Sequence, residues 1–233
     1  MSKKLYIVGV GPGSPKYLTD IARETIIKCS YIIGYRYTLR TIETIIDRSK
    51  QKVFEVTLQN QDIVYQDIYR QMKKNEYCLV PFTGDASFSE SEVVDRLLEI
   101  FGDDNVEIIP GISSIQVAAA RSKVPLDKSH ISTLHVTGDI EKKKKELSEA
   151  IHEGKSAILL PRPWPNDPTK RFMESDIAMF LKSAGVNTSA LNAFVFENLT
   201  DVENETIFIG KVSELEGMEF SDLSVLVIDQ AKR

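Results

Sequence analysis

Short apolar runs alternate with helix-spaced apolar residues through the first half of the chain. The buried-strand patterns span residues 5–10, 31–33, 77–82 and 106–109, and the helical patterns lie at 18–26, 65–72 and 94–101. Strands that alternate with helices this regularly predict an α/β fold with a mostly parallel sheet.

The second half contains more strands and fewer helices. Strand patterns occur at residues 131–136, 156–160, 190–196, 206–209 and 225–228, and helical patterns occur at 142–151 and 172–183. The consecutive strands near Ala193 and Phe208 are joined by a polar turn, which predicts an antiparallel pair within a mixed sheet. The change of pattern places a domain boundary in a connecting helix, so we expect α/β domains at 1–116 and 117–233.

Composition and charge narrow the classes of partner. Hydrophobic residues make up 42% and charged residues 27% of the 233-residue chain, as in ordinary globular proteins. The 29 Lys and Arg residues against 34 Asp and Glu residues give a net charge of −5. A protein that coats nucleic acid through many phosphate contacts is normally basic, so we expect no nucleic-acid partner. An anionic ligand must instead meet a local cluster of basic side chains.

Cysteine usage and hydropathy indicate a cytoplasmic protein. Cys29 and Cys78 stand far apart in apolar surroundings, which favours buried thiols over a disulfide. The histidines and cysteines show no metal-ligand spacing, so no metal is expected. No apolar run approaches the ~18 residues that span a bilayer. The first apolar stretch breaks at Gly9 and Gly11, too early for a signal peptide.

A glycine-rich turn at residues 9–14 directly follows the first strand, where a ligand can approach the backbone closely. A dinucleotide fingerprint would place its third glycine at Ser14 and an acidic residue where Gly34-Tyr35-Arg36 stands. Pro12 and Pro15 also delay the following helix. NAD binding is therefore disfavoured, while a different ligand and a purely structural turn both remain open.

Two further loops follow strands of the same predicted sheet. Residues 82–88 place Asp85 where it can accept hydrogen bonds from a ribose or an amine, although an aspartate there also suits a turn or a helix cap. Residues 110–114 place Ser113 and Ser114 where they can bind a polar ligand or cap the next helix. Because ligands of open parallel sheets bind outside the carboxyl ends of the strands, the three loops together predict one ligand site.

The combined motifs resemble the tetrapyrrole methylase superfamily across the whole chain. They are Val8-Gly9-Val10-Gly11-Pro12-Gly13, Leu18-Thr19, Gly84-Asp85 and Pro110-Gly111-Ile112-Ser113-Ser114. Further segments are similar to the CbiE-type branch, which methylates C5 of cobalt-precorrin-7 or precorrin-6Y. They are Ile109–Gln116, Ala118–Arg121, Phe196–Thr200 and Phe220–Ser224.

The resemblance implies two α/β domains with S-adenosylmethionine in the cleft between them, and S-adenosylhomocysteine as product. Residues implied near this cofactor are Gly9, Val10, Gly11, Asp85, Phe88, Ser113, Ser114, Leu160 and Ala193. In this scheme Asp85 bonds the ribose or the methionine amine, and Phe88 and Leu160 supply apolar walls. Ala193 lies near the adenine.

The implied substrate is a tetrapyrrole with several carboxylates, which arginine binds well through paired hydrogen bonds. Candidate substrate-binding residues are Arg36, Arg40, Arg121, Arg162 and Trp164. His135 and Asp85 are both candidates for residues that position the reactants. Each arginine also suits an ordinary surface position, and a lone histidine at a strand end also suits a structural role. The proline-rich stretch 161–168 either walls the substrate site or connects two elements rigidly.

Three departures from the family pattern concern the loops. Ala86 replaces the proline of Gly-Asp-Pro, and Ser89 stands where a glycine is common. The segment Leu134–Asp139 replaces a common Leu-His-Gly-Arg, so a basic residue is missing there. These changes bear on substrate detail more than on cofactor use.

The resemblance also implies a homodimer and a separate partner that methylates C15 and decarboxylates the C12 acetate. Three alternatives remain open at this point. They are a related methylase acting on uroporphyrinogen, diphthine or ribosomal RNA, a non-catalytic cofactor-binding module, and an NAD-dependent enzyme.

Overall fold

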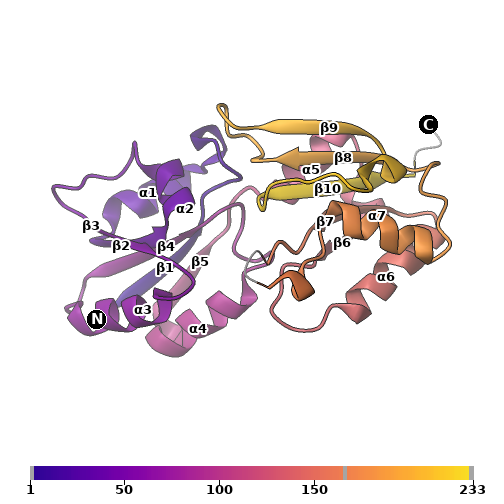
Figure 1. Cartoon of the computed structure of the whole chain (residues 1–233). Helices are drawn as coiled ribbons and strands as arrows, with labels where there is room; N and C mark the ends of the chain where they lie inside the picture. The colour runs from indigo at the N-terminus through magenta and orange to yellow at the C-terminus, as the bar shows by residue number, and fades with distance from the viewer. Residues whose placement is uncertain (1–2, 165–166, 231–233) are drawn as a thin grey trace. The chain divides into compact units, whose positions relative to one another are not determined.

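The computed structural model describes residues 3–164 and 167–230 of the chain. It divides into two compact units, Met1–Ser113 and Ser114–Arg233, each built on a five-stranded sheet (Figure 1). Residues 165 and 166 of the proline-rich stretch lie outside the described residues. Within the described ranges, no helix combines the length and the apolar character needed to cross a bilayer.

The first unit is a parallel sheet with the strand order β3-β2-β4-β1-β5. Its elements are β1 (Lys4–Gly9), α1 (Asp20–Lys28), β2 (Tyr31–Tyr35), α2 (Arg36–Ile42), β3 (Lys52–Val56), α3 (Gln61–Gln71), β4 (Tyr77–Phe82), α4 (Ser91–Phe101) and β5 (Val106–Ile109). The mostly parallel sheet predicted for this half is confirmed. Because β1 lies between β4 and β5, the loops that follow these three strands are neighbours at one edge.

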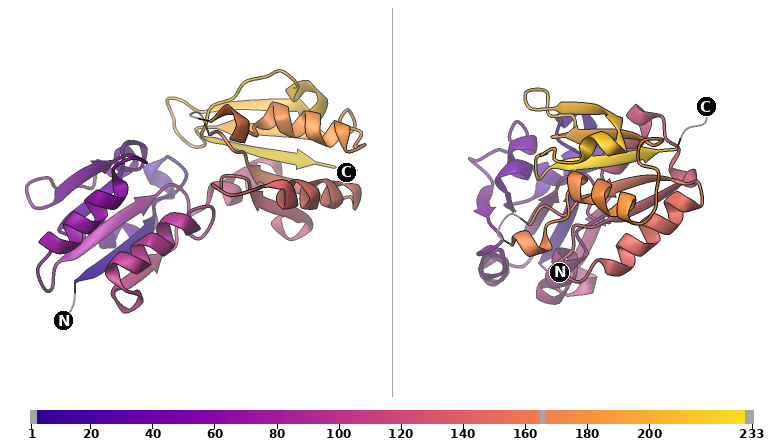
Figure 2. Two further views of the ribbon diagram at one scale, coloured as in Figure 1. Left: turned by 60° about the horizontal axis from the view of Figure 1, so that its bottom comes forward. Right: turned by 45° about the vertical axis from the view of Figure 1, so that its right-hand side comes forward.

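Helices cover both faces of this sheet, as the ribbon views show (Figure 2). On one face α3 and α4 bury Tyr65 and Leu97 against Ile7 of β1. On the other face α1 and α2 bury Ile26 and Leu39 with Val8 of β1 and neighbouring strand residues. Strands covered on both sides are apolar throughout, which explains the continuous apolar runs in the sequence.

The second unit contains a mixed sheet with the strand order β6-β7-β10-β8-β9. Its elements are α5 (Ser114–Ser122), β6 (Ser129–Thr133), α6 (Glu141–His152), β7 (Ser156–Leu160), α7 (Glu174–Ser183), β8 (Asn192–Glu197), β9 (Thr206–Lys211) and β10 (Ser224–Asp229). β6 and β7 are parallel, and the remaining neighbours are antiparallel, including the predicted β8–β9 pair. α6 and α7 pack on one face, and α5 packs against β7 and β10.

Two elements have no counterpart in the sequence prediction. α2 begins directly after β2, and no side chain caps its first turn. β3 is an edge strand in which only Val56 is buried, so it lacks the apolar run of its neighbours. β6 begins two residues earlier than predicted and ends at Thr133, beyond which Leu134 N still donates to Leu160 O at 2.9 Å. The missing cap accounts for α2, and the charged Lys52 and Glu55 account for β3.

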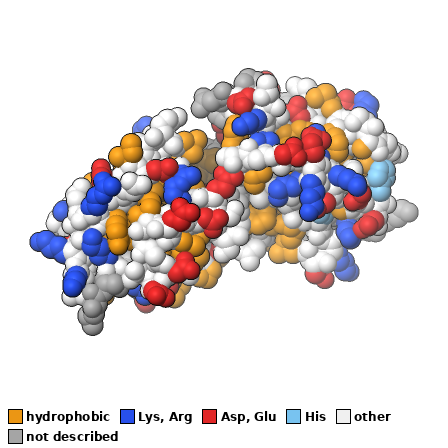
Figure 3. Space-filling view, turned by 90° about the horizontal axis from the view of Figure 1, so that it is seen from below, with side chains coloured by type: hydrophobic (Ala, Val, Ile, Leu, Met, Phe, Trp, Pro, Cys, Tyr) orange, Lys and Arg blue, Asp and Glu red, His pale blue; other side chains and the backbone are white. Residues whose placement is uncertain are grey.

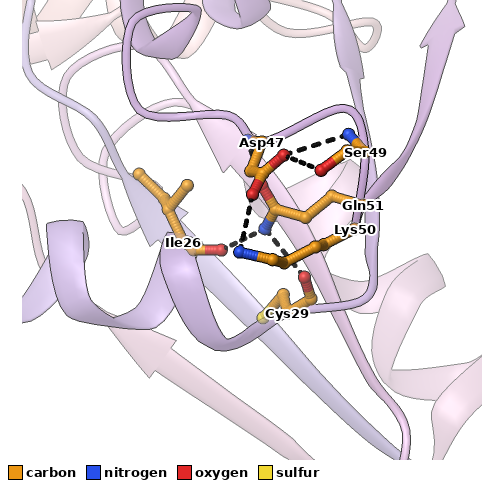
Figure 4. A network of polar contacts seen from close by, with 6 residues as sticks. All are labelled: Ile26, Cys29, Asp47, Ser49, Lys50 and Gln51. Carbon is orange, nitrogen blue, oxygen red and sulfur yellow. Dashed lines mark hydrogen bonds and ion pairs between the residues drawn. The ribbon is translucent and has the colours of Figure 1, made fainter.

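A buried glutamine closes the end of α1 (Figure 4). Gln51 is 6% exposed, and its Nε2 donates to the carbonyl oxygens of Ile26 at 2.7 Å and Cys29 at 2.8 Å. Its Oε1 accepts the backbone N–H of Asp47 at 2.8 Å. The Asp47 carboxylate in turn accepts the backbone N–H of Ser49 at 3.0 Å. The loop before β3 therefore supplies donors to carbonyls at the C-terminal end of α1, where Ile26 O also accepts the backbone N–H of Cys29 at 3.3 Å.

Both cysteines are buried free thiols, as the sequence predicts. Burial raises the pKa of Cys29 to about 12 and also raises the pKa of Cys78. A thiol with a raised pKa supplies little thiolate near neutral pH, so both side chains act as core residues rather than as nucleophiles.

Candidate functional site

The three loops singled out in the sequence meet at the carboxyl ends of β1, β4 and β5. Val10 N donates to Phe82 O at 2.8 Å. Gly11 and Gly84 exchange two backbone hydrogen bonds, of 3.2 and 2.7 Å, and so form an isolated antiparallel bridge beyond the parallel strands. The glycine-rich turn and the loop after β4 are therefore joined as one structure.

Glycine is required where the third loop joins the other two. A Cβ on Gly9 would lie 2.6 Å from Gly111 N and 2.7 Å from Gly84 O. A Cβ on Gly111 would lie 2.6 Å from the carbonyl carbon of Gly9. These distances leave no room for a side chain, so the three backbones pack directly against one another.

Asp85 fastens the same junction with its carboxylate. Oδ2 accepts the backbone N–H of Gly111 at 2.7 Å, and Oδ1 accepts the backbone N–H of Ser87 at 2.7 Å. The second bond closes the turn that the sequence offered as the alternative role for this aspartate. Direct bonding of Asp85 to a ribose or an amine stays a prediction.

The other predicted residues of these loops differ in what they can offer to a ligand. Val10 is fully buried in the core beneath α1, so only its backbone is available. Phe88 and Ser113 are half-buried, and Ser114 is half-buried at the first position of α5. Among these four residues, the polar groups are therefore backbone groups and the hydroxyls of Ser113 and Ser114.

The charge of the three loops limits the class of ligand. Segments 9–13, 83–88 and 110–114 contain one formal charge, the Asp85 carboxylate. The helix after the glycine-rich turn begins only at Asp20, so its N-terminus is not at the turn as it is in phosphate-binding loops. This edge suits a ligand with positive charge and several hydrogen-bonding groups, and it does not suit a diphosphate.

In the second unit the predicted cofactor residues lie in the sheet. Leu160 ends β7 and is half-buried, and its carbonyl oxygen accepts Leu134 N. Ala193 is fully buried in β8, opposite Gly210 of β9 and Ile228 of β10. The side chain of Ala193 belongs to the hydrophobic core, so only its backbone remains for a ligand.

The structure brings the predicted substrate-binding residues Arg162 and Trp164 together with the positioning candidate His135. Arg162 is 4% exposed, and its Nη2 donates to the carbonyl oxygens of Thr137 and Gly138, at 3.0 Å each. Its guanidinium lies 5.0 Å from the ring centroid of Trp164, and that ring meets His135 edge-on at 5.5 Å. Trp164 has a φ of +34°, an uncommon conformation for a bulky residue, and such strain clusters at functional sites.

The remaining arginines occupy two different settings. Arg36 and Arg40 are exposed on α2. Arg121, on α5, forms an ion pair with Glu205, which also accepts the backbone N–H of Thr200 at 2.6 Å. Arg121 therefore ties α5 to the β8–β9 hairpin.

The branch-like segments of the second unit lie side by side. Glu197 Oε1 accepts the backbone N–H of Ser221 at 2.6 Å, and Asn198 N donates to Leu223 O at 2.8 Å. Asn198 and Thr200 both have positive φ, at +48° and +71°. The hydrogen bonds hold a tight turn directly after β8, so these motifs have a structural use besides any contact with substrate.

The local structure shows what surrounds Ser89 and Ala86, the two residues that depart from the family pattern in the loop after β4. Ser89 has a φ of +86°, the left-handed region that a glycine occupies without strain. Ala86 is 2% exposed and packs in the core on the α3–α4 side of the sheet.

The chain matches a family model and a curated relative over nearly its whole length. The model of the Tetrapyrrole (Corrin/Porphyrin) Methylases matches residues 4–216. A probable cobalt-precorrin-7 C(5)-methyltransferase of Methanocaldococcus jannaschii is 32% identical over 226 residues, which cover 97% of each chain.

Solved structures share the fold at low sequence identity. The methyltransferase CobJ is 17% identical with a TM-score of 0.75, covering 99% of this chain and 95% of CobJ. A precorrin-6Y methylase of Archaeoglobus fulgidus is 20% identical with a TM-score of 0.66, covering 99% of both chains.

Proposed function

Because the chain belongs to the tetrapyrrole (corrin/porphyrin) methylase family, we propose that it methylates C5 of cobalt-precorrin-7 in cobalamin biosynthesis. Members of this family are S-adenosylmethionine-dependent methyltransferases, and this chain is one of them. The observation that carries the choice of reaction is the 32% identity to a probable C5-methyltransferase over 97% of both chains. The segments 196–200 and 220–224, which resemble the same branch, agree with this choice.

The loops of the first unit fit the methyl donor by their chemistry. S-adenosylmethionine, when bound, supplies an activated methyl group on a positively charged sulfur. A loop cluster with one carboxylate and no basic side chain favours such a cation. Backbone groups and the hydroxyls of Ser113 and Ser114 can donate and accept hydrogen bonds, as the ribose and the amino-acid portion of the donor require.

The chain needs few reactive side chains for this transfer. A bound S-adenosylmethionine would supply its methyl group to C5 of the acceptor, with the sulfur keeping the electron pair of the broken bond and the methylated macrocycle releasing one proton to solvent. Alignment of donor and acceptor is then the main task, and well-oriented reactants recover about 7–11 kcal/mol of a barrier. The glycine junction and the Asp85 hydrogen bonds supply the rigidity that such alignment requires.

We assign the predicted cofactor residues two kinds of role. Gly9, Val10 and Gly11 contribute backbone groups, and Phe88 and Leu160 contribute half-buried apolar surface. Asp85 acts through the loops that it joins. The proposed acceptor is a tetrapyrrole with several carboxylates. The homodimer and the separate C15-methylating decarboxylase stay predictions from the family resemblance.

Calorimetric titration with S-adenosylhomocysteine, with NADH as control, tests the donor assignment. We expect micromolar binding of the former, corresponding to about −8 kcal/mol, and no binding of NADH. The acceptor is tested with methyl-deuterated S-adenosylmethionine and three tetrapyrroles: cobalt-precorrin-7, metal-free precorrin-6Y and uroporphyrinogen III. Label transferred to uroporphyrinogen III alone would contradict the C5 assignment, and absent donor binding would contradict the enzyme.

A further inference from the structure

The second unit contains a pocket of about 410 Å³ between the loop after β6 and the segment after β7. Both strands are parallel, so their carboxyl ends lie at the same edge of the sheet, where ligands of α/β proteins usually bind. Drug-sized ligands fill pockets of roughly 300–1,000 Å³, so this one suits a small group or one arm of a larger molecule.

Basic side chains outnumber acidic ones on the walls of the pocket. Four basic residues line it, and the acidic lining residues are Asp139 and Glu141. Glu141 is already paired with Lys144, at 2.7 Å. Lys170 approaches Asp167 only at 3.9 Å, and Arg171 forms no salt bridge within the described part of the chain. In a chain with a net charge of −5, this local excess of positive charge favours an anion.

Arg162 supplies the second observation, because it is buried at the pocket wall. Its Nη2 is used by two carbonyl oxygens, but its Nε is buried and meets no acceptor among residues 3–164 and 167–230. A buried charged donor without a partner is costly, and a bound anion offsets that cost. The carbonyl oxygens of Thr137 and Gly138 are meanwhile hydrogen-bonded and less able to repel such an anion.

Lys144 is less exposed than Lys142 and Lys145 of the same helix, α6. Its side chain is 19% exposed, and its ammonium lies over the rings of Phe172 at 5.0 Å and Phe180 at 5.1 Å. Lys142 and Lys145 are 88% and 76% exposed. Figure 3 shows Lys and Arg side chains beside acidic ones on the surface that this unit presents. Lys144 therefore belongs to the pocket, while Lys142 and Lys145 are solvated.

We propose that this pocket binds a carboxylate arm of the tetrapyrrole, with Lys170 and Arg171 as its direct ligands. The proposal rests on the tetrapyrrole methylase function proposed above. Ammonium and guanidinium groups bind carboxylates through charge-assisted hydrogen bonds. Arg162 acts as a positioning residue, since its guanidinium holds the 137–138 loop and packs on Trp164. The indole of Trp164 is thereby held against one residue of the pocket wall.

Trp164 provides the measurement, because it is the only tryptophan of the chain and packs on a residue of the pocket wall. Uroporphyrin III, a stable tetrapyrrole with acetate and propionate arms, serves as the probe, and its binding is followed by quenching of tryptophan emission. We expect the double variant K170A/R171A to weaken this binding by about tenfold or more. K142A/K145A removes the same charge from the exposed positions of α6 and is expected to change the affinity by less than about twofold.

Three outcomes would overturn the proposal: equal weakening by both double variants, no binding of uroporphyrin III to the wild type, or displacement of the porphyrin by citrate at equal affinity. The first would assign the effect to overall charge, and the third would assign the pocket to small anions. Titration of every variant with S-adenosylhomocysteine separates this test from that of the proposed function. If the wild type does not bind S-adenosylhomocysteine, the proposed function is contradicted. If K170A/R171A weakens porphyrin binding but leaves the binding of S-adenosylhomocysteine unchanged, the effect belongs to the pocket.

Discussion

Asp85 shows how a motif residue can serve a ligand site without contacting the ligand. Its two carboxylate oxygens accept backbone N–H groups from Ser87 and from Gly111, which is 26 positions further along the chain. Charge-assisted bonds of this kind are stronger than neutral ones, so one side chain fixes the loops after β4 and β5 together. Loss of the carboxylate should therefore disturb the loops first and any bound ligand as a consequence.

The substitution Asp85→Ala is expected to lower both the free energy of unfolding and the affinity for S-adenosylhomocysteine. It leaves the N–H of Gly111 without its partner, which costs about 1–3 kcal/mol. Asp85→Asn keeps one acceptor oxygen and should fall between the alanine variant and the wild type. Urea unfolding and calorimetric titration measure the two effects. An alanine variant of wild-type stability that no longer binds the ligand would instead identify Asp85 as a direct ligand.

The position of this site could be predicted from the sequence, but the hydrogen bonds and ion pairs within it could not. Each loop could be found because a strand pattern ends in glycine, aspartate or serine, which are local signals. The partners of Asp85, Arg162 and Arg121 could not be found, since each bond joins positions far apart in the chain. In the sequence, Lys144 cannot be told apart from the other lysines of residues 142–145, and its low exposure and its contacts with Phe172 and Phe180 appear only in the structure.

At the scale of elements, strands were predictable where a compact apolar or β-branched run stands beside clear turn signals, even in β5, where Ile109 is the one buried residue. β4, β5 and β7 match the predicted ranges residue for residue, because each is a compact β-branched or apolar run beside clear turn signals. β3 is not predicted by the pattern because the charged Lys52 and Glu55 interrupt its apolar residues. α2 is not predicted because it starts without a capping side chain, directly after β2.

The junction of the β1, β4 and β5 ends should be intolerant of a single methyl group. Gly9→Ala and Gly111→Ala each place a Cβ within 2.7 Å of backbone atoms, which have no freedom to rotate away. We expect each to destabilise the protein by about 1–3 kcal/mol or more. Gly138→Ala is the matched control, because nothing lies within 4 Å of its added Cβ. Urea unfolding compares the three, and a Gly111→Ala variant as stable as Gly138→Ala would contradict the packing described here.

At the scale of the whole molecule, the two units carry separate chemistry and separate signals. The glycine junction and Asp85 belong to the first unit, while the basic pocket and Trp164 belong to the second. Tryptophan emission therefore reports on the second unit alone, since the chain has no other tryptophan. This makes it possible to follow the stability of the second unit without isolating it.

Glu174 should make that stability depend on pH. It begins α7 with no exposed surface, and neither carboxyl oxygen has a hydrogen-bond partner in the described ranges. Burial raises the pKa of Glu174, and this effect outweighs the nearby Ser224 hydroxyl and the backbone N–H of Glu174, which lower it although neither makes a hydrogen bond of good geometry to the carboxyl. The native state therefore holds the proton to higher pH than the unfolded chain, whose glutamates titrate near pH ~4.3. Stability is lost as pH rises from that value through the raised pKa of the folded state.

The variant Glu174→Gln keeps the shape of the side chain and removes its titration. Near pH ~4 the difference between the variant and the wild type should be small, because the wild-type carboxyl is protonated in the native state and mostly protonated in the unfolded chain. Toward pH ~8 the variant should become the more stable, because only the wild type must then bury a charge or hold a proton against the solvent. Urea unfolding followed by Trp164 emission at both pH values measures the difference, and Glu219→Gln, at an exposed position of the same unit, controls for the lost charge. A difference between Glu174→Gln and wild type that stays constant with pH, or shrinks as pH rises, would show that the carboxyl is ionised in the native state and that α7 tolerates its charge.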